Sequence, residues 1–126
     1  MDGTVIAGGD GLPDIVVRPE RGRLVRPERI DDVEFGTLFT PNMFRMRWVE
    51  GRWQDACIEP VQDLRLHPGA TVLHYAQSVF EGMKAYRHPS GDIVLFRPEM
   101  NIARMNASAI RLEMPQVPSE FMLKAI

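Results

Sequence analysis

Three arginines near the end of the sequence have the spacing of an anion-binding stripe. Arg97, Arg104 and Arg111 recur every seven residues, so on an α-helix all three lie along one edge. A guanidinium presents a planar fork of N–H donors that matches the oxygens of a phosphate or a carboxylate. The alternative is the solvated basic edge of a surface helix, and the spacing does not select which arginine would bind an anion.

A second candidate region is residues 74–82, which combine two aromatic rings, an acid and a glycine. Tyr75 and Phe80 could wall an apolar substrate pocket, with the Tyr75 hydroxyl as its polar contact. The alternative is that both rings belong to the core and that Gly82 serves only the backbone geometry.

Other signals for chemistry are weak. Residues 8–11 (GGDG) follow no convincing strand and precede Leu12 and Pro13 rather than a long helix, which indicates a turn and not a phosphate loop. The three histidines and Cys57 lack the spacing of metal ligands, and no serine has the context of a nucleophile elbow. We therefore expect neither a metal site nor a serine nucleophile.

The composition is that of an ordinary globular domain, with 44% hydrophobic and 25% charged residues and a net charge of −2. This charge gives no reason to expect a nucleic-acid or membrane partner, and no apolar run reaches the roughly 20 residues of a bilayer span. The N-terminus lacks the segments of a signal peptide, and a single cysteine fits a reducing compartment, so we expect a cytoplasmic protein.

Two hairpins are predicted to hold the candidate residues in place. Residues 44–48 alternate apolar side chains with arginines, as a half-buried strand does, and residues 53–58 return after a turn at 50–51. Residues 83–87 and 92–96 flank the turn sequence HPSG and predict a second hairpin. Residues 71–75 are apolar and rich in strand formers, which predicts a further short strand.

A helix is predicted to begin at Pro98, where the missing N–H of proline costs nothing, and to end at Pro115. Its apolar face consists of Ile102, Met105, Ala109 and Leu112. Ser119 is predicted to cap a second helix from Glu120, of which only seven residues remain, so we expect the chain to stop inside an element.

Hairpins followed by helices indicate an α+β fold rather than alternating βα units. Residues 1–33 are rich in arginine, acids and proline and predict an extended charged N-terminal arm. Residues 34–126 are expected to form one small domain.

The blocks around these candidates resemble the branched-chain amino-acid aminotransferases, which are pyridoxal-phosphate enzymes of fold type IV. The resemblance covers residues 33–126. It is carried by residues 35–36 (FG), 39–44 (FTPNMF), 58–60 (IEP), 72–87 (VLHYAQSVFEGMKAYR), 94–105 (VLFRPEMNIARM), 108–109 (SA) and 111–112 (RL), in the order that the family has. It implies the small N-terminal domain of that fold, with antiparallel hairpins packed with helices. Ala76 departs from the pattern, because relatives often have glycine there.

The resemblance implies a role for four side chains. Arg104 falls where the family binds the phosphate of pyridoxal 5′-phosphate, and Tyr75, Phe80 and Phe35 fall where it lines the pocket for the branched side chain. The reaction implied is the transamination of leucine, isoleucine and valine with 2-oxoglutarate by a homodimer. The remaining candidates keep structural interpretations: Arg97, Arg111 and Glu81.

Neither lysine of the chain, Lys84 or Lys124, falls where the family has its Schiff-base lysine, which belongs to a second and larger domain. We therefore expect no catalytic residue in these 126 residues, and no transaminase activity from them alone. The alternatives are a stand-alone non-catalytic module of the same fold, or the small domain of a D-amino-acid aminotransferase or an aminodeoxychorismate lyase.

Overall fold

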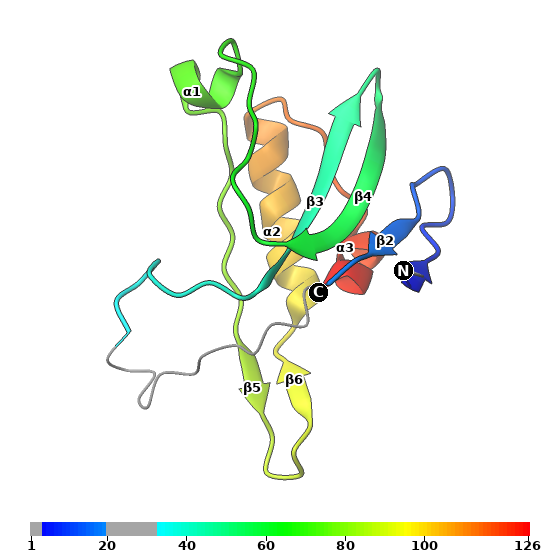
Figure 1. The fold of residues 1–126 in the computed structure, drawn as a ribbon, viewed down its shortest axis with the longest axis vertical. Coiled ribbons are helices and arrows are strands. Elements are labelled where there is room, and N and C mark those ends of the chain that lie inside the picture. The colour runs from blue at the N-terminus through cyan, green and yellow to red at the C-terminus, as the bar shows by residue number, and fades with distance from the viewer. Residues whose placement is uncertain (1–3, 20–32) are drawn as a thin grey trace. The chain divides into compact units, whose positions relative to one another are not determined.

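A computed structural model describes residues 4–19 and 33–126. The chain divides into two compact units, Met1–Leu64 and Arg65–Ile126, and each is described by itself (Figure 1). The first unit contains a sheet and the second contains a hairpin and helices, so the arrangement is α+β, as predicted.

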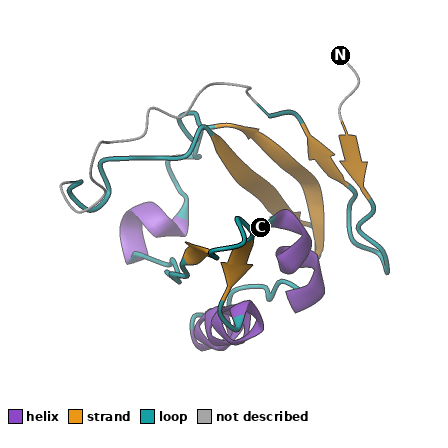
Figure 2. Ribbon diagram, turned by 90° about the horizontal axis from the view of Figure 1, so that it is seen from below, coloured by secondary structure: helices purple, strands orange, loops and turns teal. Residues whose placement is uncertain are grey.

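The first unit is a four-stranded sheet of order β1-β2-β4-β3. Strands β1 (Thr4–Ile6) and β2 (Ile15–Val17) pair antiparallel, as do β3 (Asn42–Val49) and β4 (Arg52–Pro60), whereas β2 and β4 run parallel. The long curved pair β3 and β4 is seen with the shorter strands beside it in Figure 2. The predicted hairpin over residues 44–58 is confirmed, with its turn at Glu50 and Gly51, both of which have positive φ.

The two faces of this sheet differ in chemistry because side chains alternate along each strand. Val17, Ile58 and Phe44 are in register across β2, β4 and β3, and they share one apolar face with the buried Ile15 and Ala56. The other face has a different set in register, namely Val16, Cys57 and Arg45. The alternation of residues 44–48 therefore separates an apolar side from a side that carries arginines.

The predicted N-terminal arm enters this sheet in part. Residues 4–6 and 15–17 of that arm are strands β1 and β2, so the sheet contains residues from both sides of the predicted boundary at residue 33. Residues 20–32, which hold much of the charged sequence, lie outside the described residues. The boundary between arm and domain stays a prediction.

The second unit begins with a short helix where a strand was predicted. Residues Thr71–Tyr75 form α1, which has no buried residue, and the prediction of a strand is wrong. The apolar sequence would suit a sheet, but the only strands of this unit are β5 (Ala85–Arg87) and β6 (Ile93–Leu95), which pair with each other. Local bonds decide instead: Leu73 N donates to the Ala70 carbonyl at 3.0 Å, and His74 Nε2 donates to the Pro68 carbonyl at 2.6 Å. The predicted hairpin of β5 and β6 is confirmed, with shorter strands.

Two helices complete the second unit. Helix α2 (Pro98–Arg111) confirms the predicted helix and buries Ile102 and Ala109 of its apolar face. Helix α3 (Ser119–Ala125) buries Phe121 and contacts α2. Asn106 exchanges two hydrogen bonds with the backbone of Val117, which fixes the connection between the helices.

The predicted cap of α3 is wrong by one position. Pro118 occupies the N-cap with extended backbone, and Ser119 is the first helical residue and makes no capping hydrogen bond. Proline cannot continue a preceding helix but tolerates this boundary, since its missing N–H is not needed there. In the part of the chain that is described, no helix is long and apolar enough to cross a membrane.

Candidate functional site

Arg104 lies in the middle of α2 and forms a bidentate ion pair with Glu81, which belongs to the loop between α1 and β5. Arg104 Nε donates to Glu81 Oε2 at 2.9 Å, and Nη2 donates to Oε1 at 2.5 Å. The pair joins two segments 23 residues apart in the sequence. It fixes the plane of the guanidinium, because both atoms that face the carboxylate are held.

Glu81 also binds the backbone and side chains around it. Asn101, one turn before Arg104 on α2, donates from Nδ2 to Glu81 Oε1 at 2.9 Å and to the Gly82 carbonyl at 2.7 Å. Gly82 N donates to the same Oε1 at 3.2 Å. The hydrogen bonds from Arg104 and Asn101 lower the pKa of Glu81 from its ordinary 4.5 to about 2, so the carboxylate stays charged in weak acid.

The two partners are exposed to different degrees. The side chain of Glu81 is 13% exposed, whereas that of Arg104 is 63% exposed. The acid is therefore held against the unit, and the guanidinium keeps its far edge in solvent. A guanidinium has five N–H donors, and the two hydrogen bonds to Glu81 leave three of them for a ligand.

The other two arginines of the predicted stripe have different surroundings. Arg97 is the N-cap of α2, with left-handed backbone at φ 48° and ψ 51°, so it precedes the helix rather than lying along it. Arg111 is exposed in the last turn of α2, where its positive charge interacts favourably with the helix dipole. Among the described residues, neither guanidinium forms an ion pair, and the geometry singles out Arg104.

The three aromatic candidates are all exposed. Tyr75 ends α1 and is 82% exposed, and Phe80 lies in the following loop and is 81% exposed. Phe35 belongs to the other unit and is 92% exposed. Neither Tyr75 nor Phe80 is a core residue, so the core alternative for these two rings is wrong. A role in substrate binding stays a prediction for all three rings.

The loop that carries Phe80 is tied down at its start. Ala76 adopts left-handed backbone at φ 50° and ψ 34° and ends α1. Gln77 then accepts a hydrogen bond from Thr71 Oγ1 at 2.6 Å and donates one to the Leu112 carbonyl at 2.8 Å. This links the loop to the end of α2, the helix that carries Arg104.

The histidines serve local turns. His67 Nδ1 accepts from Gly69 N at 3.0 Å, His74 binds the Pro68 carbonyl, and His88 Nδ1 lies 2.8 Å from Ser90 Oγ in the β5–β6 turn. Over residues 4–19 and 33–126, no three of the side chains His, Cys, Asp and Glu gather as metal ligands would.

Several known proteins have sequences similar to that of this chain. A probable branched-chain-amino-acid aminotransferase of Streptomyces coelicolor is 44% identical over 117 residues, which cover 90% of this chain and 32% of that protein. Branched-chain-amino-acid transaminase 1 of Bacillus subtilis is 46% identical over 73% of this chain and 26% of its own length. The cytosolic branched-chain-amino-acid aminotransferase of Mus musculus is 39% identical over 90% and 29%. Over most of its length, this chain is similar in sequence to branched-chain-amino-acid aminotransferases.

The chain spans about a third or less of the length of these branched-chain aminotransferases. No protein-family model matches it. The sequence predicted only a structural role for Glu81, and it did not predict the hydrogen bonds that join Glu81 to Arg104 and Asn101. Their spacing to Arg104 offered a partial signal: Asn101 lies three residues before Arg104, so the two share one helix face.

Proposed function

We propose that this chain forms the part of a branched-chain amino-acid transaminase that anchors the phosphate of pyridoxal 5′-phosphate. The observation that carries the proposal is the Arg104–Glu81 pair. An arginine whose plane is fixed by a carboxylate on one edge, and whose other edge is in solvent, presents aligned donors to a second anion.

The donors of Arg104 fit a phosphate. Glu81 engages Nε and one N–H of Nη2, so both N–H groups of Nη1 and the second of Nη2 remain. One Nη1 and one Nη2 hydrogen point in parallel along the outer edge, a geometry that matches two phosphate oxygens. A lysine at this position would offer a point charge without this directional pair.

When bound, pyridoxal phosphate supplies an electron sink for the charge that develops at the substrate Cα. The role that we assign to Arg104 is to hold the cofactor in one orientation through its phosphate. Glu81 keeps the guanidinium in place, and Asn101 keeps Glu81 in place.

We assign the binding of the substrate side chain to Tyr75 and Phe80 of the second unit. For Phe35, which belongs to the first unit, the resemblance alone supports such a role. Exposed rings are suited to this role, since they would bury apolar area only when substrate or further protein covers them. Leucine, isoleucine and valine differ by a methylene or its position, which is worth about 1–3 kcal/mol, so such a pocket should separate them weakly. The names of the relatives support these substrates.

We further propose fold type IV, a homodimer and a cytoplasmic location. The many exposed large apolar side chains of the second unit, such as Tyr75, Phe80 and Phe96, support an assembly that covers them.

A titration with two vitamers tests the phosphate assignment. Pyridoxamine 5′-phosphate and pyridoxamine share the ring but differ in the phosphate, and neither forms a Schiff base with surface lysines. Titrated into the ¹⁵N-labelled chain, the phosphorylated compound should shift the amides of Asn101, Arg104 and Gly82 in a saturable way, and pyridoxamine should not. Equal shifts from both compounds, or none at Arg104, would overturn the assignment.

A further inference from the structure

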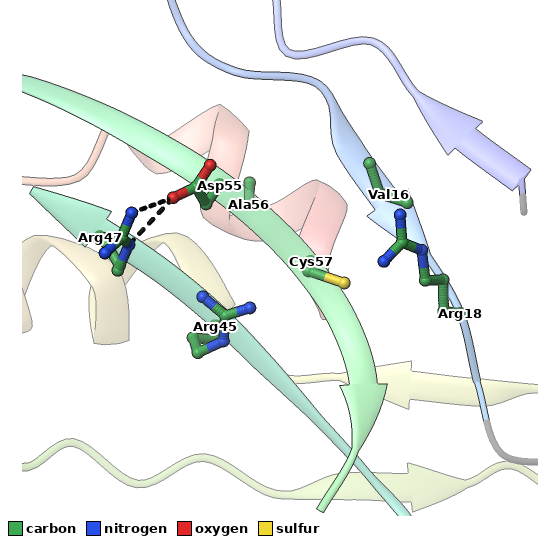
Figure 3. A pocket seen from close by; sticks show the side chains of 7 residues that line it. All are labelled: Val16, Arg18, Arg45, Arg47, Asp55, Ala56 and Cys57. Atoms are coloured by element: carbon green, nitrogen blue, oxygen red, sulfur yellow. Dashed lines mark hydrogen bonds and ion pairs between the residues drawn. The ribbon is translucent and has the colours of Figure 1, made fainter. Parts of the chain in front are cut away.

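The charged face of the four-stranded sheet carries a hollow of about 420 Å³, a volume in the range of small-molecule sites. It is lined by Val16, Arg18, Arg45, Arg47, Asp55, Ala56 and Cys57, and all of them belong to the first unit (Figure 3). Its three arginines outnumber the two carboxylates beside them, Asp55 in the lining and Glu59 paired with Arg45, so the hollow is basic.

The register of the strands brings the arginines together. Arg45 on β3 is opposite Cys57 on β4, which is opposite Val16 on β2. Arg18 and Arg47 each lie two residues further along the chain from Val16 and Arg45, and so on the same face. Figure 3 shows Cys57 between the guanidinium of Arg45 and that of Arg18.

Two of the arginines are held in position by carboxylates. Arg45 donates from Nε to Glu59 Oε1 at 2.7 Å and from Nη2 to Oε2 at 3.3 Å. Arg47 donates from Nε and Nη2 to Asp55 Oδ2 at 2.9 and 2.5 Å. Asp55 reaches Arg47 because its backbone is left-handed, at φ 56°, where the ladder between β3 and β4 is irregular. In both arginines Nη1 is left over.

Arg18 differs from the other two. It is exposed, and its guanidinium makes no hydrogen bond or ion pair to any of the described residues. Its backbone is anchored, since Arg18 N donates to the Ile58 carbonyl at 2.8 Å. Cys57, which also lines the hollow, carries no charge that would repel an anion. Burial raises the pKa of its thiol, so the thiol stays protonated.

We propose that this hollow binds a phosphate-type oxyanion between Arg18, Arg45 and Arg47. A carboxylate has two oxygens in one plane and is satisfied by one guanidinium fork, whereas the oxygens of a phosphate point in tetrahedral directions. Donors that arrive both from β3, which carries Arg45 and Arg47, and from Arg18 at the end of β2 suit the second shape. The partner is inorganic phosphate or the phosphate group of a small metabolite.

The proposal is tested by titrating inorganic phosphate into the ¹⁵N-labelled 126-residue chain at constant ionic strength. The amides of Val16, Arg45 and Cys57 should shift with a saturable, millimolar midpoint. Sodium chloride at the same ionic strength should not reproduce these shifts, and if it does, the hollow is a screened basic surface and the proposal fails.

Arg18→Gln is the decisive variant, because Arg18 stabilises no described ion pair and its loss should leave the sheet folded. The midpoint of the phosphate titration, read at the amide of Cys57, should rise about fivefold, as expected for the loss of one exposed charge. Arg87→Gln, which removes an exposed arginine of the second unit, should leave the midpoint unchanged. An unchanged midpoint in Arg18→Gln overturns the proposal.

The readout by residue keeps this proposal apart from the assignment of Arg104. Shifts at Arg104 that survive in Arg18→Gln, without shifts at Val16 and Cys57, would reject the hollow and leave the proposed function standing. Shifts at Cys57 without any at Arg104 support the hollow, whatever becomes of the proposed function.

Discussion

Glu81 and Arg104 are bound by two parallel hydrogen bonds, yet the acid is mostly covered and the base is mostly exposed. Because of this difference in exposure, only the guanidinium of the pair faces solvent. The covered carboxylate is fixed by Asn101 and Gly82, and the guanidinium extends from it with one edge in solvent. The pair therefore presents the positive charge of Arg104 to solvent, while Glu81 holds the guanidinium in place.

Glu81→Gln should destabilise the second unit at neutral pH, because it removes the charged acceptor of Arg104 and Asn101. The folded pKa of Glu81 lies below its ordinary value, so its contribution to the free energy of unfolding is present above about pH 4.5 and is lost as the pH falls towards about 2. Urea unfolding at pH 7, 5, 4 and 3 should show the difference between wild type and variant shrinking over the acid range.

The control for this series is Asp63→Asn, which removes an exposed carboxylate of the first unit. Its stability should follow that of the wild type at each pH. A difference between wild type and Glu81→Gln that stays constant from pH 7 to 3 would contradict the assigned ion pair.

Ala76→Gly should stabilise the chain. Ala76 has left-handed backbone, in which a Cβ clashes with the carbonyl oxygen, and glycine removes this strain at the end of α1. We expect a gain of about 1 kcal/mol in the free energy of unfolding. Ala70→Gly, just before α1 and with φ of −62°, is the matched control and should be neutral or destabilising. A loss of stability in Ala76→Gly would show that the conformation is different.

Phe121→Ala should cost about 3–5 kcal/mol, since Phe121 is one of the largest fully buried side chains in the described residues. Leu123→Ala, on the same helix but 38% exposed, should cost less than about 1 kcal/mol. Chemical denaturation of both variants measures the difference. Similar losses in the two would mean that α3 does not pack through Phe121.

The 126 residues alone should not transaminate leucine with 2-oxoglutarate in the presence of pyridoxal phosphate. Lys84 is exposed next to β5, and Lys124 lies in the last turn of α3. By the resemblance, neither lysine falls where the family has its Schiff-base lysine. The rate should equal that of free cofactor at the same concentration. Turnover above that rate, lost in Lys84→Ala or Lys124→Ala, would contradict the absence of a catalytic residue.

The elements that the sequence predicted correctly have a clear period or, as in the hairpin of β5 and β6, a clear turn sequence. The hairpin of β3 and β4 follows from alternating residues around Glu50 and Gly51, and α2 follows from Pro98 and its apolar face. Helix α1 could not be predicted, because five residues carry no helical period. It depends instead on the hydrogen bond of His74 to the Pro68 carbonyl and on the left-handed backbone of Ala76. The parallel pairing of β2 with β4 likewise joins strands that are distant in sequence.

The sequence predicted the arginine donors of the candidate site, but it did not predict the ion pair that holds Arg104. Seven-residue spacing put three arginines forward, and only the resemblance separated Arg104 from the other two. In the structure, the ion pair with Glu81 is what distinguishes Arg104 from the other two arginines. This pair spans 23 residues and depends on how the loop returns to α2, which the sequence does not show. The basic hollow at Arg18 was not predicted, because it needs three strands in register.

The most direct test of the central claim compares Arg104→Gln with Arg111→Gln, two exposed arginines of the same helix. The midpoint for pyridoxamine 5′-phosphate, read at the amide of Asn101, should weaken about tenfold or more in Arg104→Gln, as expected for lost charge-assisted hydrogen bonds. It should stay unchanged in Arg111→Gln. Equal midpoints in wild type and Arg104→Gln would contradict the claim that Arg104 anchors the phosphate.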